Sequence, residues 1–148
     1  MVNDLTIELI KKSEALRLEA YKCSAGVWTI GYGNTEYKNG KKVKQGDKIT
    51  KKQAEEEFKY DIERYEKELR PLITVKVTEN EFGAILSLAY NLKDGINKIK
   101  NSTLLRLLNS NARKEDVANQ FDRWVYAEGK KLDGLVKRRA REKALFLS

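Results

Sequence analysis

The chain has 148 residues, of which 41% are hydrophobic and 35% charged, values typical of a folded, soluble domain rather than a disordered segment. No apolar run approaches the roughly 18–20 residues of a membrane-spanning helix, and no export signal is visible at the start of the sequence. The single cysteine excludes an internal disulfide. The absence of histidine excludes Ser-His and Cys-His catalysis and disfavours a zinc site.

The net charge is +8, from 30 basic and 22 acidic side chains. A basic surface favours polyanionic partners, which include nucleic acids and the anionic wall or membrane surface of a bacterium. Composition alone does not separate these partners.

The first predicted element is a short helix over about residues 4–13, capped by Asn3 or Asp4. Three short strands follow, in the segments EAYK, GVWTIGY and TEYKNGKKVK, and the Asn39-Gly40 pair predicts a hairpin turn in the third segment.

Helices make up the rest of the prediction. Capping boxes at Thr50 and Thr78 open two of them, and Pro71 ends the first. A short helix around 104–108 is capped by Asn101 or Ser102, another carries Val117, Phe121, Trp124 and Val125, and the last is capped by Asp133. The whole pattern is α+β, with a small antiparallel sheet inserted near the N-terminus of a mainly helical chain, and we expect a ligand cleft between the two parts.

The segment from Glu14 to Thr35, EALRLEAYKCSAGVWTIGYGNT, groups polar residues that a strand does not need for folding. Side chains alternate across a strand, so Trp28, Ile30 and Tyr32 are expected to pack. The other face, with Val27, Thr29, Gly31 and Gly33, is expected to be open to a polymer. Cys23 is expected close to Thr29, and Glu14 at the junction with the first helix. Taken singly, these residues are equally typical of a surface acid, a small core residue and a strand threonine.

The spacing resembles the active-site segment of the phage-type lysozymes, the endolysins of glycoside hydrolase family 24. In that family a glutamate is followed after eight residues by aspartate or cysteine, and after five more by threonine, and here Glu14, Cys23 and Thr29 keep these gaps. The blocks ENEFGAILSLAYNLKDG, NSTLLRLLN, FDRWVYAEGK and GLVKRRARE also resemble the family, so the resemblance covers nearly the whole chain. Asn34 departs from the usual histidine after GYG, which puts local stability in doubt.

The resemblance implies one lysozyme-like domain, 1–148, with a β lobe at about 15–48, a linking helix at about 50–70, and a helical lobe at about 71–148 joined by the helix at about 4–13. It implies hydrolysis of the β-1,4 bond between N-acetylmuramic acid and N-acetylglucosamine in peptidoglycan. Glu14 would be the general acid, with Cys23 and Thr29 positioning the attacking water, and the outcome would be inversion. A covalent route through a Cys23 thiolate stays open.

Further residues are expected around the substrate from the resemblance and from their polarity. The substrate-binding candidates are Gly31, Tyr32, Gly33, Thr35, Tyr90, Asn91, Asn101 and Thr103. Tyr32 is also expected to pack on the apolar face, and Asn101 has helix capping as its alternative role. Behind the site we expect Asn34, Arg138 and Arg139, one arginine pairing with Glu14 or its neighbours and the other on the surface.

No metal or cofactor is expected. Two alternatives remain beside hydrolysis: a non-catalytic wall-binding domain of the same fold, and a lytic transglycosylase that cleaves the same bond without water. A nucleic-acid partner is disfavoured because basic residues are interleaved with acids, as in KKQAEEEFKYDIERYEKELR. We expect a monomer without stable membrane insertion, held in the cytoplasm until it is released to the peptidoglycan.

Overall fold

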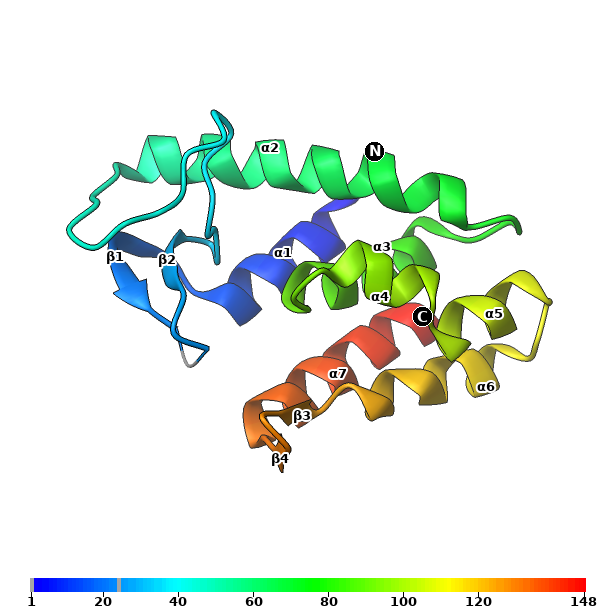
Figure 1. Ribbon diagram of the computed structural model, residues 1–148. Helices are drawn as coiled ribbons and strands as arrows, with labels where there is room; N and C mark the ends of the chain where they lie inside the picture. The colour runs from blue at the N-terminus through cyan, green and yellow to red at the C-terminus, as the bar shows by residue number, and fades with distance from the viewer. Residues whose placement is uncertain (1, 24) are drawn as a thin grey trace. The chain divides into compact units, whose positions relative to one another are not determined.

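The computed structural model describes residues 2–23 and 25–148. The chain forms two compact units, one of residues up to Leu9 together with Tyr65–Ser148, and one of Ile10–Arg64. Both boundaries fall inside helices, α1 (Asp4–Glu14) and α2 (Lys51–Leu69) (Figure 1). The α+β class predicted from the sequence is confirmed. The predicted lobe boundaries stay a prediction.

The sheet of the unit Ile10–Arg64 has two strands, β1 (Arg17–Lys22) and β2 (Trp28–Gly31). They pair antiparallel, with Tyr21 opposite Thr29, and the register shifts between Arg17 and Tyr21. Their connection places Cys23 and Thr29 on neighbouring strand ends, as the sequence predicted.

The third predicted strand, 35–44, is wrong. The turn at Asn39-Gly40 is present, with Gly40 at φ +86°, but the segment forms only a bridge between Glu36 and Lys42 within the described part of the chain. Two carboxylates explain this difference. Glu57 accepts from the Lys38 backbone N–H at 2.8 Å, and Asp47 accepts from the Lys44 backbone N–H at 3.0 Å, so these amides are not available to a strand ladder.

The core of this unit lies between α2 and β2. Ala54, Phe58 and Ile62 form the predicted stripe on α2, and all three are buried. Tyr32 packs on Phe58 with ring centroids 5.1 Å apart. The predicted capping box opens α2, because Thr50 and Gln53 exchange hydrogen bonds between side chain and backbone.

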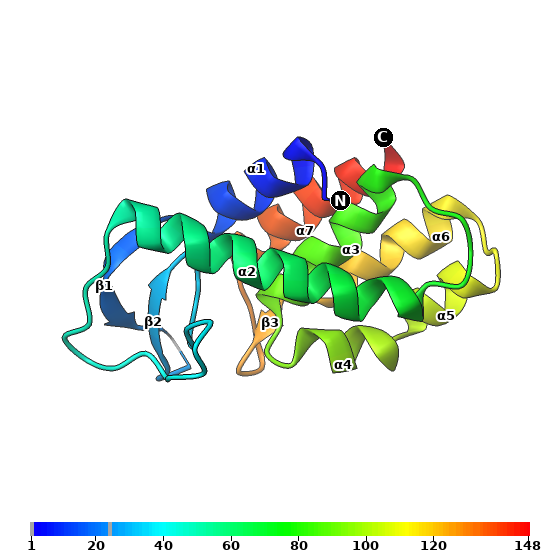
Figure 2. The same cartoon turned by 90° about the horizontal axis from the view of Figure 1, so that it is seen from above.

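The other unit is helical and is built around α3 (Glu79–Asn91) packed against α7 (Asp133–Leu147) (Figure 2). Its remaining elements are η1 (Arg70–Leu72), α4 (Gly95–Lys100), α5 (Thr103–Asn109), α6 (Lys114–Asn119), η2 (Gln120–Arg123), β3 (Tyr126–Ala127) and β4 (Lys130–Lys131). Buried side chains such as Phe82, Ile85, Phe121 and Phe146 fill its core.

Besides the capping box at Thr50, three predicted helix starts are confirmed and one is wrong. Asn3 accepts from the Thr6 backbone N–H at 3.1 Å, Thr78 forms a complete capping box, and Ser102 caps α5. Asp133 is the first residue of α7 rather than its cap, since Leu132 occupies the cap position and makes no side-chain cap bond.

The helix predicted through Trp124 and Val125 ends earlier. Trp124 has the non-helical angles φ −103° and ψ 52°, and the chain then forms the β3–β4 hairpin. Glu128 (φ 52°) and Gly129 (φ +77°) supply the left-handed turn that this short hairpin needs. The sequence analysis missed this hairpin and α4.

Across residues 2–23 and 25–148, each helix is too short or too polar to cross a lipid bilayer.

Candidate active site

The Gly31-Tyr32-Gly33 sequence forms a tight loop at the end of β2. Ile30 and Asn34 close the loop with two backbone hydrogen bonds of 2.8 Å, each donating to the carbonyl of the other. Gly31 has φ +65° and Gly33 φ +86°, which residues with a side chain rarely adopt. The two glycines are therefore required by the backbone of this loop.

Glu14 lies directly against this loop. It is the last residue of α1, and the chain turns sharply after it through Ala15, at φ 52°. A Cβ atom built on Gly33 would lie 2.8 Å from Glu14 Oε1 and 3.3 Å from its Cδ. The missing side chain at Gly33 is therefore what lets the carboxyl group approach the loop.

If Glu14 has the role of general acid predicted from the sequence, Gly33→Ala should lower the predicted hydrolysis of peptidoglycan at least about ten-fold. The new methyl group would displace the Glu14 carboxyl, and misplacement of about 1 Å can cost two orders of magnitude in rate. The matched control is Gly46→Ala, since Gly46 also has φ +86° but has open space where its Cβ would lie. Rates and thermal unfolding of both variants are compared. Equal activity in the two variants would show that the approach of Glu14 to Gly33 is unimportant.

Cys23 and Thr29 meet at the Val27 carbonyl. This oxygen accepts from the Cys23 backbone N–H at 3.0 Å and from the Thr29 hydroxyl at 3.0 Å. Burial raises the pKa of the Cys23 thiol, but hydrogen bonds from the Val27 and Ala25 backbone and from the Thr29 side chain outweigh it, and the pKa lies below its usual value. The sulfur is half-buried, and its environment favours the thiolate.

Tyr21 is a neighbour of this group that the sequence analysis missed. Burial raises the pKa of the Tyr21 phenol, the charge of Glu14 raises it further, Arg17 lowers it, and a charged Cys23 adds to the increase. The Arg17 guanidinium stacks on the Tyr21 ring, 4.4 Å from its centroid. The sequence held a signal for Tyr21: once the turn between β1 and β2 is placed, the pairing of the two strands puts Tyr21 opposite Thr29.

The open face predicted for β2 is wrong. Thr29 is 4% exposed, and Gly31 is buried with the Asn34, Ile49 and Ala54 side chains around the place of its missing Cβ. The alternation rule fails because the positive φ at Gly31 ends the regular strand. The missing side chains at Gly33 and Gly31 leave room for the side chains of Glu14 and Asn34. A role for the two glycines in binding sugar stays a prediction.

Tyr32 packs in the core, as predicted for the apolar face. Its hydroxyl donates to Glu55 at 2.9 Å, and Lys11 donates to the other oxygen of that carboxylate at 2.5 Å. Lys11 also lies over the Tyr32 ring, 5.2 Å from the centroid. These contacts fix the position of Tyr32, and because Lys11 belongs to α1 they connect the Gly31-Tyr32-Gly33 loop to that helix.

Asn34, which follows the Gly31-Tyr32-Gly33 loop, is 2% exposed. Its amide donates to Asp61 Oδ2 at 2.5 Å. Burial raises the pKa of Asp61 to about 6, against the lowering effects of Arg64 and of this hydrogen bond. The amide of Asn34 is neutral, so its contact with Asp61 does not depend on an ion pair, and the charge of Asp61 is lost as the pH falls through about 6.

The remaining substrate-binding candidates lie outside this group. Thr35 is exposed just beyond the loop. In the helical unit, Tyr90 packs on Tyr65, Asn91 accepts from Arg139 at 2.8 Å, and Thr103 accepts from Arg123 at 3.4 Å. Asn101 does cap a helix, but at the C-terminus of α4 rather than at the start of α5: its side-chain amide donates to the Asn97 carbonyl at 2.9 Å. Asn101 and Thr103 do line one small polar hollow of about 270 Å³.

Both Arg138 and Arg139 are buried, so the expectation that one lies on the surface is wrong. Glu142, which is fully buried, contacts both: Arg139 Nε lies 2.6 Å from Oε1, and Arg138 Nε lies 3.3 Å from Oε2. Ser87 also donates to Glu142, at 2.5 Å. The spacing of three and four residues in RRARE was a signal for this cluster, which the sequence analysis did not use.

Within the described residues, no three Cys, Asp or Glu side chains lie together in a way that could hold a metal ion.

Glu14 at a helix end beside the glycine loop, in an α+β fold, agrees with the lysozyme-like glycoside hydrolase expected from the sequence. The sequence profile described as phage lysozyme matches residues 11–142. The chain is similar to an endolysin of Acyrthosiphon pisum secondary endosymbiont phage 1, with 42% identity over 99% of this chain and 98% of the relative.

Two solved structures are also similar over the whole chain. An endolysin from Escherichia coli O157:H7 phage FAHEc1 gives a TM-score of 0.88 at 37% identity, covering 94% of that structure. A mutant of P22 lysozyme gives 0.81 at 36% identity, covering 99%. The chain belongs to the phage lysozyme family, and it is a glycoside hydrolase that acts on peptidoglycan.

Proposed function

We propose that the protein hydrolyses the β-1,4 bond between N-acetylmuramic acid and N-acetylglucosamine, with Glu14 as the general acid and inversion at the anomeric carbon. Cys23 and Thr29 position the attacking water. The proposal takes the cell wall as the site of action, after release from the cytoplasm, and a monomer as the active form.

One observation supports these roles above the others. The charges of Glu14 and Cys23 both raise the pKa of the Tyr21 phenol, and Tyr21 is the cross-strand partner of Thr29. The three residues thus all lie near Tyr21, although they come from a helix end, the position just after β1, and β2. The contact of Glu14 with Gly33 adds a second constraint on the position of the acid.

The chemistry needs a proton at the leaving oxygen and a nucleophile on the opposite face of the sugar. Glu14 gives its proton to the glycosidic oxygen as the bond from that oxygen to the anomeric carbon breaks. The oxygen of the held water forms the new bond to this carbon. The water proton passes to the Cys23 sulfur in its deprotonated form, which the lowered pKa of the thiol favours relative to a free cysteine.

Thr29 contributes through its lone pairs. A hydroxyl has one proton to donate, and two acceptors, the Val27 carbonyl and the Cys23 sulfur, share the Thr29 proton. Its oxygen therefore acts as an acceptor toward a water proton, which fixes the orientation of the water. Because Thr29 is buried, only a small molecule such as water is expected to reach it.

Product analysis tests this proposal. Purified peptidoglycan is digested in water enriched in oxygen-18, with the Glu14→Gln variant as the control without the acid. We expect reducing-end N-acetylmuramic acid that carries the label, formed first as the α anomer because the β bond is inverted.

Other products would each overturn a specific part of the proposal. An anhydro sugar without the label would indicate a lytic transglycosylase. A β anomer formed first would indicate retention, and with it the covalent route through Cys23. Tight wall binding without any product would indicate a non-catalytic domain.

A further inference from the structure

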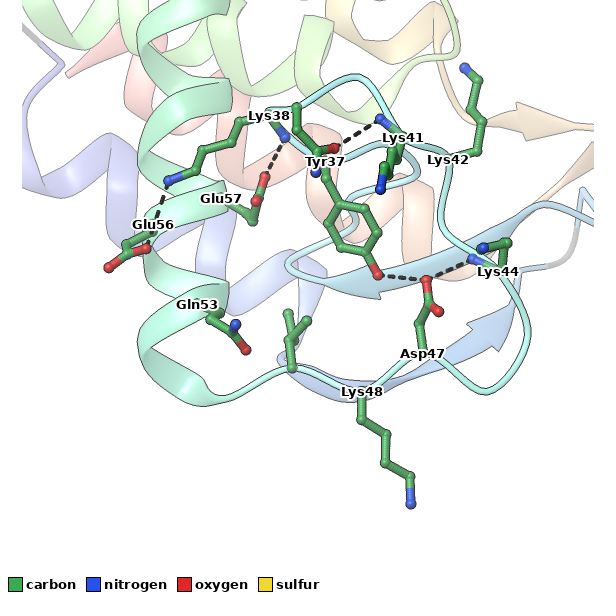
Figure 3. Close-up of a pocket in the computed structure, with 12 residues that line it drawn as sticks. Tyr37, Lys38, Lys41, Lys42, Lys44, Asp47, Lys48, Gln53, Glu56 and Glu57 are labelled. Carbon is green, nitrogen blue, oxygen red and sulfur yellow. Dashed lines mark hydrogen bonds and ion pairs between the residues drawn. The ribbon is translucent and has the colours of Figure 1, made fainter.

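A concentration of lysines lies in the unit Ile10–Arg64, apart from the residues proposed for catalysis. Five lysines, Lys38, Lys41, Lys42, Lys44 and Lys48, line a hollow of about 410 Å³, which we call the lysine hollow (Figure 3). The segment 35–48 that supplies them has only two acids, Glu36 and Asp47. All five lysines are exposed.

The acids that line the lysine hollow are largely occupied in holding its backbone. Asp47 accepts from the Tyr37 hydroxyl at 2.8 Å and from the Lys44 backbone N–H at 3.0 Å. Burial and Asp47 raise the pKa of Tyr37 to about 12, so this donor keeps its proton under all physiological conditions. Glu57 holds the Lys38 backbone N–H at 2.8 Å. The loop is therefore fixed by its acids.

Three of the five ammonium groups are left for a partner. Lys42 pairs with Glu36 at 2.8 Å, and Lys38 lies 3.7 Å from Glu56. Lys41, Lys44 and Lys48 make no ion pair with any residue among 2–23 and 25–148. Three exposed positive charges on one loop favour the binding of a polyanion.

The directions of the side chains indicate the shape of the anion. Lys42 and Lys48 extend to opposite sides of the lysine hollow in Figure 3, and the lysines do not converge on one point. A compact anion would need converging donors, whereas a linear chain with repeated charges can contact separated ammonium groups in turn. Lysine is suited to such contacts, as a point charge on a flexible stem.

Two other classes of polyanion fit less well. A bilayer-binding surface presents apolar side chains for insertion, but Ile49 is the one aliphatic residue that lines this hollow in the described chain, and it is half-buried. Single-stranded nucleic acid needs aromatic rings for stacking, and the Tyr37 ring is half-buried with its hydroxyl engaged by Asp47.

We propose that the lysine hollow is a docking surface for a phosphodiester polymer of the bacterial cell wall, of the polyol-phosphate type. The proposal rests on the proposed function for its setting, since it takes the wall as the place where the enzyme works. Such docking would keep the enzyme at the wall between cleavage events, without a contact to the bond that is cut.

The test measures binding of soluble poly(glycerol phosphate), which contains no bond that a muramidase can cleave, so the result is independent of hydrolysis. The triple variant K41Q/K44Q/K48Q is expected to bind at least about ten-fold more weakly than the unaltered chain. The slope of log affinity against log salt should become shallower by about 2, at about 0.7 for each lost phosphate contact.

The matched control is K67Q/K93Q/K137Q, which removes three exposed lysines outside the lysine hollow. It loses the same net charge and should keep affinity within about two-fold. Both triple variants should digest phosphate-free peptidoglycan at the unaltered rate, which also reports that they are folded.

Three results would overturn the proposal. Equal loss of affinity in both triple variants would mean that only net charge matters. Equal affinity for poly-glutamate would show that phosphate is not recognised, and equal or tighter binding to phosphatidylglycerol vesicles would make the surface a membrane site. If the unaltered chain binds poly(glycerol phosphate) but does not hydrolyse peptidoglycan, the result would count against the proposed function and not against the docking surface.

Discussion

Replacing Glu14 by Gln is expected to lower the rate of peptidoglycan hydrolysis by about 100-fold to 10,000-fold, the usual contribution of a general acid. The amide has nearly the same shape as the carboxyl group and can keep its position beside Gly33, but it has no proton to give to the leaving oxygen. Thermal unfolding should therefore change little. Turbidity clearing of permeabilised cells measures the rate.

Glu8→Gln is the matched control for this variant. Glu8 lies on the same helix, α1, and is exposed, so the change removes the same charge away from Gly33. It should keep nearly full activity. If Glu14→Gln clears cells as fast as Glu8→Gln does, Glu14 is not the acid, and the catalytic assignment fails even though the family does not change.

The second large effect is expected on stability. Glu142→Gln should lower the free energy of unfolding by about 3–5 kcal/mol, because it removes the negative charge that compensates two buried guanidinium groups. Arg138 and Arg139 are 4% and 0% exposed, so water cannot replace the lost partner. Urea denaturation measures the change.

Glu115→Gln is the control for this effect. Glu115 also pairs with an arginine, Arg113, but at 3.8 Å and with 63% of its side chain exposed. Exposed pairs contribute at most about 1 kcal/mol. If the two variants lose similar amounts of unfolding free energy, the burial of Glu142 has no special effect on stability.

Local signals in the sequence predicted much of the fold. The capping boxes at Thr50 and Thr78 depend on hydrogen bonds within one helical turn, so they can be recognised from four residues. The tight connection expected after Cys23 predicted its proximity to Thr29, and the expected end of the first helix placed Glu14 at the junction with the sheet. The catalytic roles of the three stay predictions.

The errors arose where a distant group decided the local structure. The segment 35–44 has the composition of a strand, but Glu57, on α2, takes one of its amides. Gly31 was placed on an open face because strand alternation was assumed, whereas its positive φ turns the chain inward toward Asn34. Arg138 and Arg139 look like surface charges until their burial with Glu142 is known.

The contact between Glu14 and Gly33 has a consequence for how the chain folds. It joins residues that are 19 positions apart, and the contact between Cys23 and Thr29 joins residues six positions apart. Short loops close within about a microsecond and lose little chain entropy in doing so. The hydrogen bond from Ser87 to Glu142, by contrast, spans 55 positions. The acid and its neighbours therefore assemble by local closure, at a small entropic cost.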